Sequence, residues 1–115
     1  MKFMLFVCVD RDSYDRETDE ERTDPDKREP MPWVDELDAA GIRLDGDELR
    51  PFYDATTVRV RDGEVLLGDG PFAETKEVIA GYDIIECADL DEAVAIAARH
   101  PVSQFGVIEV RPYRG

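Results

Sequence analysis

Four polar side chains in the second half of the chain could carry acid–base or binding chemistry: Asp69, Glu74, Lys76 and His100. His100 is the chain's single histidine, and imidazole is the side chain whose ordinary pKa lies nearest neutral pH. We therefore take His100 as a candidate general acid or base, with Asp69 as its catalytic partner. Lys76 is suited to hold a small anionic ligand, with Glu74 beside it. The competing interpretation is a partly exposed histidine at a helix end, with its charge favoured by the helix dipole, and a local ion pair.

The Gly68-Asp69-Gly70-Pro71 stretch requires unusual backbone angles, because glycine readily adopts positive φ and proline fixes its own φ. Its amide groups could form a small anion-binding nest. A tight turn in which Asp69 bonds its own backbone explains the same residues. Both interpretations stay open at this point.

Other site chemistries lack their residues. One histidine and two cysteines on separate apolar runs do not make a zinc site, so we expect no metal. No nucleophile–base pair, phosphate loop or dinucleotide fingerprint is present, so we expect no cofactor. Cys8 and Cys87 lie within apolar runs, which predicts buried, reduced thiols and a cytoplasmic location.

Composition narrows the class of protein. A chain of 115 residues fits one domain, 1–115, and a net charge of −14 excludes a generic nucleic-acid binder and disfavours an anionic membrane surface. No stretch is apolar enough to span a bilayer. Residues 10–32 alternate charges of both signs, which predicts an acidic, solvated, mobile loop.

The first half of the chain predicts a strand, a helix and a hairpin. Residues 2–9 are apolar on both faces, which is typical of a central strand covered on both sides. A helix is expected from Pro32 to Gly41, with Trp33 anchored in the core, and 42–49 is weakly extended. Residues 56–61 and 64–67 flank Asp62-Gly63, a strong hairpin signal that places Arg61 opposite Glu64 and Val60 opposite Val65.

The second half predicts a strand at 80–87, a helix from Asp89 to Pro101 and a strand within 105–113. Asp89 and Glu92 form a capping box at the helix start. The whole order is that of an α+β, ferredoxin-like split βαβ domain with an extra β-hairpin. Its helices cover only one sheet face, so the doubly apolar first strand predicts two sheets packed face to face in a homodimer.

This fold also predicts where the polar residues meet. The second helix of a split βαβ ends at the sheet edge where the preceding strand begins, so His100 is expected near Ala80 and Gly81. The loop from Asp69 to Lys76 feeds that strand, and Tyr82 on it completes the candidate ligand-binding set of Glu74, Lys76 and Tyr82. The hairpin leaves open which edge the loop occupies.

The segment Asp69-Gly70-Pro71-Phe72-Ala73-Glu74-Thr75-Lys76-Glu77 resembles the signature of the YCII-related proteins, in the branch named for its Asp-Gly-Pro-Phe motif. The resemblance runs through 80–86 and 89–93 and closes at 107–112. It implies a dimeric α+β barrel and little about chemistry. Members of the wider family carry a His in the first helix and an Asp before a Pro after the second. Here the first helix has no His, and His100 precedes Pro101.

Two functions follow as hypotheses. The first is a homodimeric small-molecule domain, either a weak acid/base enzyme or a ligand binder, with its site at the Asp-Gly-Pro-Phe loop. The alternative is a non-catalytic regulatory or protein-interaction module, since some relatives of this branch resemble domains associated with sigma factors.

Overall fold

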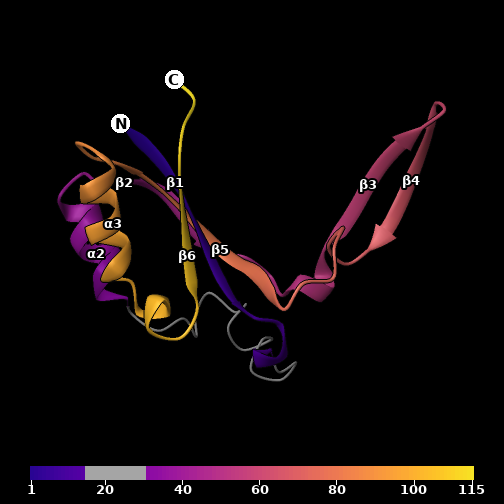
Figure 1. The fold of residues 1–115 in the computed structure, drawn as a ribbon, viewed down its shortest axis with the longest axis horizontal. Helices are drawn as coiled ribbons and strands as arrows, with labels where there is room; N and C mark the ends of the chain where they lie inside the picture. The colour runs from indigo at the N-terminus through magenta and orange to yellow at the C-terminus, as the bar shows by residue number, and fades with distance from the viewer. Residues whose placement is uncertain (15–30) are drawn as a thin grey trace.

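A computed structural model describes residues 1–14 and 31–115 of the chain, so most of the loop predicted at 10–32 lies outside the described residues. Four antiparallel strands form the main sheet in the order β2-β5-β1-β6, with β1 central (Figure 1). Their bounds are Lys2–Asp10 for β1, Arg43–Glu48 for β2, Glu77–Glu86 for β5 and Val107–Pro112 for β6. The sequence predicted this interleaving, in which each βαβ unit has a strand of the other between its own two.

Two helices, α2 (Pro32–Ala39) and α3 (Leu90–Ala98), lie side by side on one face of this sheet (Figure 1). Their ends follow local signals. Pro32 opens α2, and Gly41, with φ of 72°, ends it. The Asp89 carboxylate accepts a hydrogen bond from the Glu92 backbone N–H at 2.9 Å, as the predicted capping box requires.

Short 3₁₀ turns complete the connections: η1 (Arg11–Ser13), η3 (Phe52–Asp54) and η4 (Pro101–Gln104). The last turn directly follows α3, so the chain does not leave the helical layer at Pro101. No helix among the described residues is both long and apolar enough to cross a membrane.

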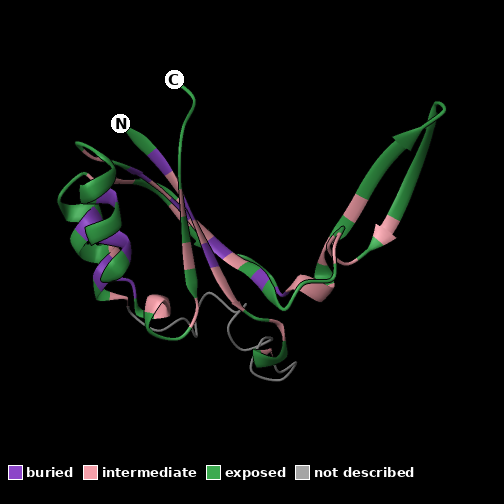
Figure 2. Ribbon diagram, viewed as in Figure 1, coloured by how far each residue is buried: buried purple, intermediate pink, exposed green. Residues whose placement is uncertain are grey.

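The core lies between the helices and one face of the sheet (Figure 2). It contains Phe3 and Leu5 of β1, Ile85 of β5, Trp33 and Leu37 of α2, and Ala93 and Ile96 of α3. Trp33 is buried and donates its indole N–H to the Ile96 carbonyl at 3.0 Å, so the predicted core anchor is confirmed. The opposite sheet face carries Met4, Phe6, Cys8, Tyr82 and Ile84, all half-buried in the single chain. We call it the open sheet face.

The predicted hairpin forms a separate two-stranded sheet from β3 (Thr56–Arg61) and β4 (Glu64–Asp69). Arg61 pairs with Glu64 and Val60 with Val65, and both turn residues have positive φ, 51° at Asp62 and 80° at Gly63. The register predicted from the Asp-Gly turn is therefore confirmed. The hairpin projects away from the main sheet, without helices on either side (Figure 1).

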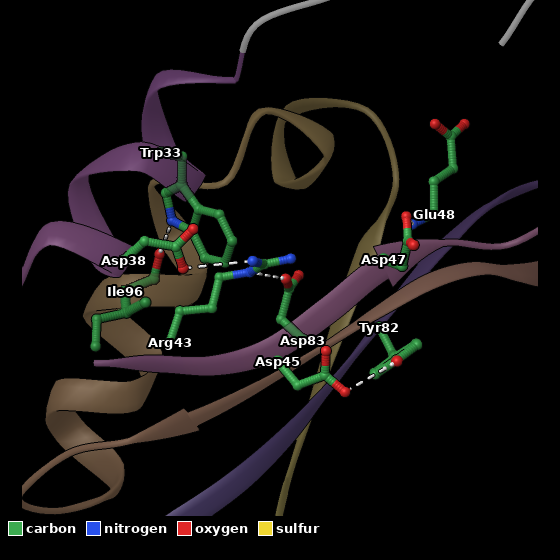
Figure 3. Close-up of polar contacts among 9 residues, drawn as sticks. All are labelled: Trp33, Asp38, Arg43, Asp45, Asp47, Glu48, Tyr82, Asp83 and Ile96. Carbon is green, nitrogen blue, oxygen red and sulfur yellow. Dashed lines mark hydrogen bonds and ion pairs between the residues drawn. The ribbon is translucent and has the colours of Figure 1, made fainter. Parts of the chain in front are cut away.

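A buried ion pair, absent from the sequence-based expectations, joins edge strand β2 to the sheet (Figure 3). Arg43 Nε donates to Asp83 Oδ1 at 2.8 Å, and Arg43 Nη1 lies 3.4 Å from Asp38 of α2. Burial raises the pKa of Asp83, and the bond from Arg43 opposes that rise. Gly46 makes room for the pair, because a Cβ there would collide with the Asp83 carboxylate and lie 2.8 Å from the Tyr82 carbonyl oxygen.

Gly46→Ala should therefore destabilise the fold, by about 1–3 kcal/mol, because the added methyl group must displace the ion pair or the strand. Gly68→Ala is the matched control, since its Cβ would meet only the Thr57 Cβ, at 3.9 Å. Urea unfolding of both variants measures the effect. Equal stability of the two variants would show that the close approach at Gly46 is unimportant.

Candidate functional site

The Asp-Gly-Pro-Phe loop is tied to the base of the hairpin. Gly70 has φ of 80°, and its N–H donates to the Ala55 carbonyl at 2.7 Å. The Thr57 hydroxyl donates to the Gly70 carbonyl, also at 2.7 Å. These two bonds hold the loop beside the start of β3, and the Phe72 side chain is left 80% exposed.

A groove with a volume of about 590 Å³ lies next to this loop. Three segments form its walls: the connection from β2 to β3, the Asp-Gly-Pro-Phe loop, and the first residues of β5. The lining residues are mostly apolar: Leu49, Pro51, Phe52, Ala55, Pro71, Phe72, Ala73, Val78 and Ile79, with Arg50, Asp54, Thr75 and Glu77 as the polar members.

The charged side chains of the groove largely cancel. Arg50 Nε lies 3.0 Å from Asp54 Oδ2, which makes an ion pair within the β2–β3 connection. The Thr75 hydroxyl donates to the Glu77 carbonyl, so it is already engaged with backbone. The Glu77 carboxylate is then the one charge of the lining without an opposite charge paired to it among the described residues.

Phe52, which lines the groove, also belongs to an aromatic cluster. The rings of Tyr14 and Tyr53 each lie 5.5 to 6.5 Å from a neighbour in edge-to-face contacts that include Phe52. The Arg11 guanidinium carbon lies 4.3 Å from the centre of the Phe52 ring, a cation–π distance. The Arg11 backbone N–H also donates to the Lys76 carbonyl at 2.7 Å. The end of β1 is thereby joined to the start of β5 beside the groove.

His100 lies elsewhere, in the helical layer. It is only 4% exposed, and its ring packs edge-to-face on Trp33 with centroids 4.6 Å apart. Its Nδ1 accepts the Val102 backbone N–H at 3.0 Å, so the proton of the neutral ring is on Nε2. Burial lowers the pKa of His100, which corrects the expectation of a partly exposed ring whose charge is favoured by the helix dipole.

The other predicted site residues are dispersed. Asp69 is the last residue of β4 and pairs with Thr56, whereas Glu74 and Lys76 follow in the exposed loop. Tyr82 lies on the open sheet face, where its hydroxyl donates to Asp45 at 3.3 Å (Figure 3). The negative charge of Asp45 raises the pKa of Tyr82.

Among the described residues, no hydrogen bond or ion pair joins His100 to Asp69, Glu74 or Lys76. None of the five predicted residues lines the groove, although Glu74 and Lys76 are chain neighbours of residues that do, and Asp69 lies two residues before Pro71. What the sequence reasoning missed is the wall from Leu49 to Ala55. Its signal was the Pro51-Phe52-Tyr53 run, which carries two large aromatic side chains outside any predicted helix or strand.

The remaining candidate ligands for a metal ion are scattered. Within residues 1–14 and 31–115, no group of three or more His, Cys, Asp or Glu side chains is arranged to hold one. Cys8 and Cys87 are unpaired and half-buried rather than buried. Burial is the main cause that raises the pKa of both thiols, which disfavours the reactive thiolate.

The chain belongs to the YCII-related domain family, whose model matches residues 4–115. It is also similar to the uncharacterized protein R00369 of Rhizobium meliloti (strain 1021), with 46% identity over 66 residues. That match covers 56% of this chain and 53% of the relative, so the chain spans about half the length of the curated relative it matches.

The fold is similar to that of 5-chloro-2-hydroxyhydroquinone dehydrochlorinase (TftG) from Burkholderia phenoliruptrix AC1100, solved in complex with 2,5-dihydroxybenzoquinone. The TM-score is 0.50 at 16% sequence identity, over 99% of this chain and 94% of that one. At this identity the likeness shows a shared α+β fold.

The burial of His100 predicts a specific pH dependence of stability. Its folded-state pKa lies below the ordinary value of 6.5, so the unfolded chain binds the proton more readily. The stabilising contribution is complete above about pH 6.5 and is lost as the pH falls below it. Urea unfolding between about pH 7 and pH 5.5 should therefore show a steeper loss for the wild type than for His100→Asn. Asparagine cannot titrate but can still accept the Val102 N–H, so parallel curves would contradict the burial argument.

Proposed function

We propose that this chain is a small-molecule domain of the Asp-Gly-Pro-Phe branch of the YCII-related family, and that it binds its ligand in the groove beside that loop. The observation that carries the proposal is the groove itself. It is walled by apolar side chains from three chain segments, and its volume of about 590 Å³ falls in the range typical of small-molecule sites.

The lining favours a neutral, flat and largely apolar ligand. Phe52, Phe72 and Ile79 offer broad apolar surfaces, and the Arg50–Asp54 pair cancels its own charge. Glu77 remains as a hydrogen-bond acceptor for a hydroxyl or amine group on the ligand. The competing possibility is the anionic ligand predicted from Lys76. The charge of the ligand distinguishes these two possibilities.

The shared fold with TftG suggests which probes to use. That protein is named as a dehydrochlorinase and was solved with 2,5-dihydroxybenzoquinone. We carry over no reaction from it and take only the choice of substituted aromatic rings as test ligands.

Catalysis by His100 and Asp69 is a separate proposal from binding. The His100 ring is engaged with Trp33 and Val102 and does not line the groove. An acid–base role would therefore require a ligand that reaches the helical layer. Binding in the groove has no such requirement, and for that reason we place it first.

The homodimer is proposed from the open sheet face. Met4, Phe6 and Ile84 are half-buried there, no layer of residues 1–14 and 31–115 packs over them, and a second copy of the chain would cover them. The ferredoxin-like, dimeric α+β barrel implied by the family resemblance has this arrangement. Light scattering should then give about twice the chain mass of 13.0 kDa.

The second candidate function, a non-catalytic regulatory or protein-interaction module, is favoured by one observation. The β3–β4 hairpin exposes several large aliphatic side chains outside the groove. Exposed apolar surface of this kind marks interaction sites in many proteins.

Ligand titration of two variants tests the groove. Phe72→Ala should weaken binding of 2-naphthol by roughly tenfold, because it removes one broad wall of the groove. Phe105→Ala is the matched control, since Phe105 is 76% exposed but lies outside the lining, and it should bind like the wild type. Calorimetry or NMR titration provides the affinities.

The charge of the ligand is tested with 2-naphthoate, the anionic counterpart of 2-naphthol. Weaker binding of the anion is expected from the unpaired Glu77 carboxylate. Tighter binding of the anion, lost in Lys76→Ala, would instead favour the anionic ligand. Binding of neither compound, or equal losses in the two phenylalanine variants, would overturn the groove as the site.

A further inference from the structure

The two faces of the β3–β4 hairpin differ in chemistry. Cross-strand partners share a face, so Val58, Val60, Val65 and Leu67 lie together on one side. Their side chains are 59%, 56%, 65% and 71% exposed, respectively. The other face carries Arg59, Arg61, Glu64 and Leu66 together with Thr57 and Gly68. The central residues of one face are therefore all aliphatic, whereas the other face is mainly polar and charged.

An aliphatic face on an isolated hairpin requires a cover. Two strands alone are at best marginally stable in water. Because aliphatic and polar residues alternate along both strands, the polar face suits contact with solvent and the aliphatic face suits contact with another apolar surface. Figure 2 shows that the hairpin is exposed along almost its whole length. No element of residues 1–14 and 31–115 lies over its aliphatic face, which leaves that face available to a second molecule.

We propose that the β3–β4 hairpin is a dimerisation arm, whose aliphatic face packs on the open sheet face of a second copy of the chain. This rests on the proposed homodimer and adds the element that completes it. The open sheet face carries an apolar strip along its central strands β1 and β5, which no layer of residues 1–14 and 31–115 covers. Charged residues of the edge strands flank this strip: Asp45, Asp47, Glu109 and Arg111. Each copy therefore carries both an uncovered arm and a surface that an arm can cover.

The dimensions of the two surfaces agree. Each arm strand has six residues, which gives an arm of about 20 Å at about 3.3 Å per residue. Four strands at about 4.8 Å spacing make a sheet nearly as wide, so one arm is long enough to reach the apolar strip on β1 and β5 at the centre of its partner's sheet.

The area that a stable dimer needs also favours this occupant. The four aliphatic side chains of the arm offer on the order of 300 Å², whereas a stable interface buries about 800 Å² on each partner. The arm alone is therefore too small to hold any partner firmly. Joined to the open sheet face of the same chain, it contributes to one continuous interface, and two-fold symmetry supplies that contact twice.

Two neighbouring leucines provide the test. Leu67→Asp places a carboxylate on the aliphatic face, and Leu66→Asp places the same group on the polar face of the same strand. Both residues are exposed in the single chain, so neither change should disturb its fold, which circular dichroism checks. By sedimentation at micromolar concentrations, Leu67→Asp should raise the dimer dissociation constant at least about tenfold. Leu66→Asp should leave it within about threefold of the wild type.

Photo-crosslinking identifies the surface that the arm contacts. With p-benzoylphenylalanine in place of Leu67, crosslinks should join two copies and map to the open sheet face, for example at Met4. A wild-type monomer, equal dissociation by the two leucine variants, or crosslinks confined to the other arm would each overturn the proposal. A wild-type dimer that both variants leave intact would overturn the arm but not the homodimer. Binding of 2-naphthol is read separately in the same variants, so failure of the groove is distinguishable.

Discussion

The ion pair between Arg43 and Asp83 ties the strand that leads into the groove to the rest of the domain. Strand β2 is an edge strand with one neighbour, and the Arg43 side chain ties it both to β5 and, through Asp38, to helix α2. The chain runs from the end of β2 directly into the segment that forms one wall of the groove. A buried pair of this kind gives little net stability over an apolar alternative, but breaking it leaves a buried charge and is costly.

The helical layer and the loops around the groove differ in what their contacts do. The helical layer is closed by contacts that satisfy its own polar groups: Trp33 bonds Ile96, and His100 holds the turn after α3 through the Val102 N–H. Those contacts give His100 a structural role that needs no ligand. The groove lies at the start of β5, where the connection from β2 to β3 and the Asp-Gly-Pro-Phe loop meet. Loops carry fewer constraints on residue type, so ligand specificity can change there while the core is kept.

Much of the fold could be predicted because its signals are local. The Asp62-Gly63 turn sets the hairpin register, and Pro32, Gly41 and Asp89 mark helix ends within a few residues of where they act. The site could not be predicted in the same way. The pairing of Arg43 with Asp83 depends on an irregular register between β2 and β5, and the burial of His100 depends on Trp33, far away in the chain. The groove likewise joins three segments whose meeting is set by the fold, so the Asp-Gly-Pro-Phe motif pointed to the region but not to the side chains that line the groove.

The length of the chain explains why so much apolar surface is left outside the core. Two short helices are enough to cover one face of a four-stranded sheet, and the described chain supplies no second layer for the other. Small domains bury a modest fraction of their surface, so apolar residues kept on an open face usually serve association. The high negative charge works against association by repulsion at long range. In the proposed homodimer, apolar and specific contacts would have to overcome this repulsion, and the hairpin, with aliphatic residues on one face and polar residues on the other, offers such contacts.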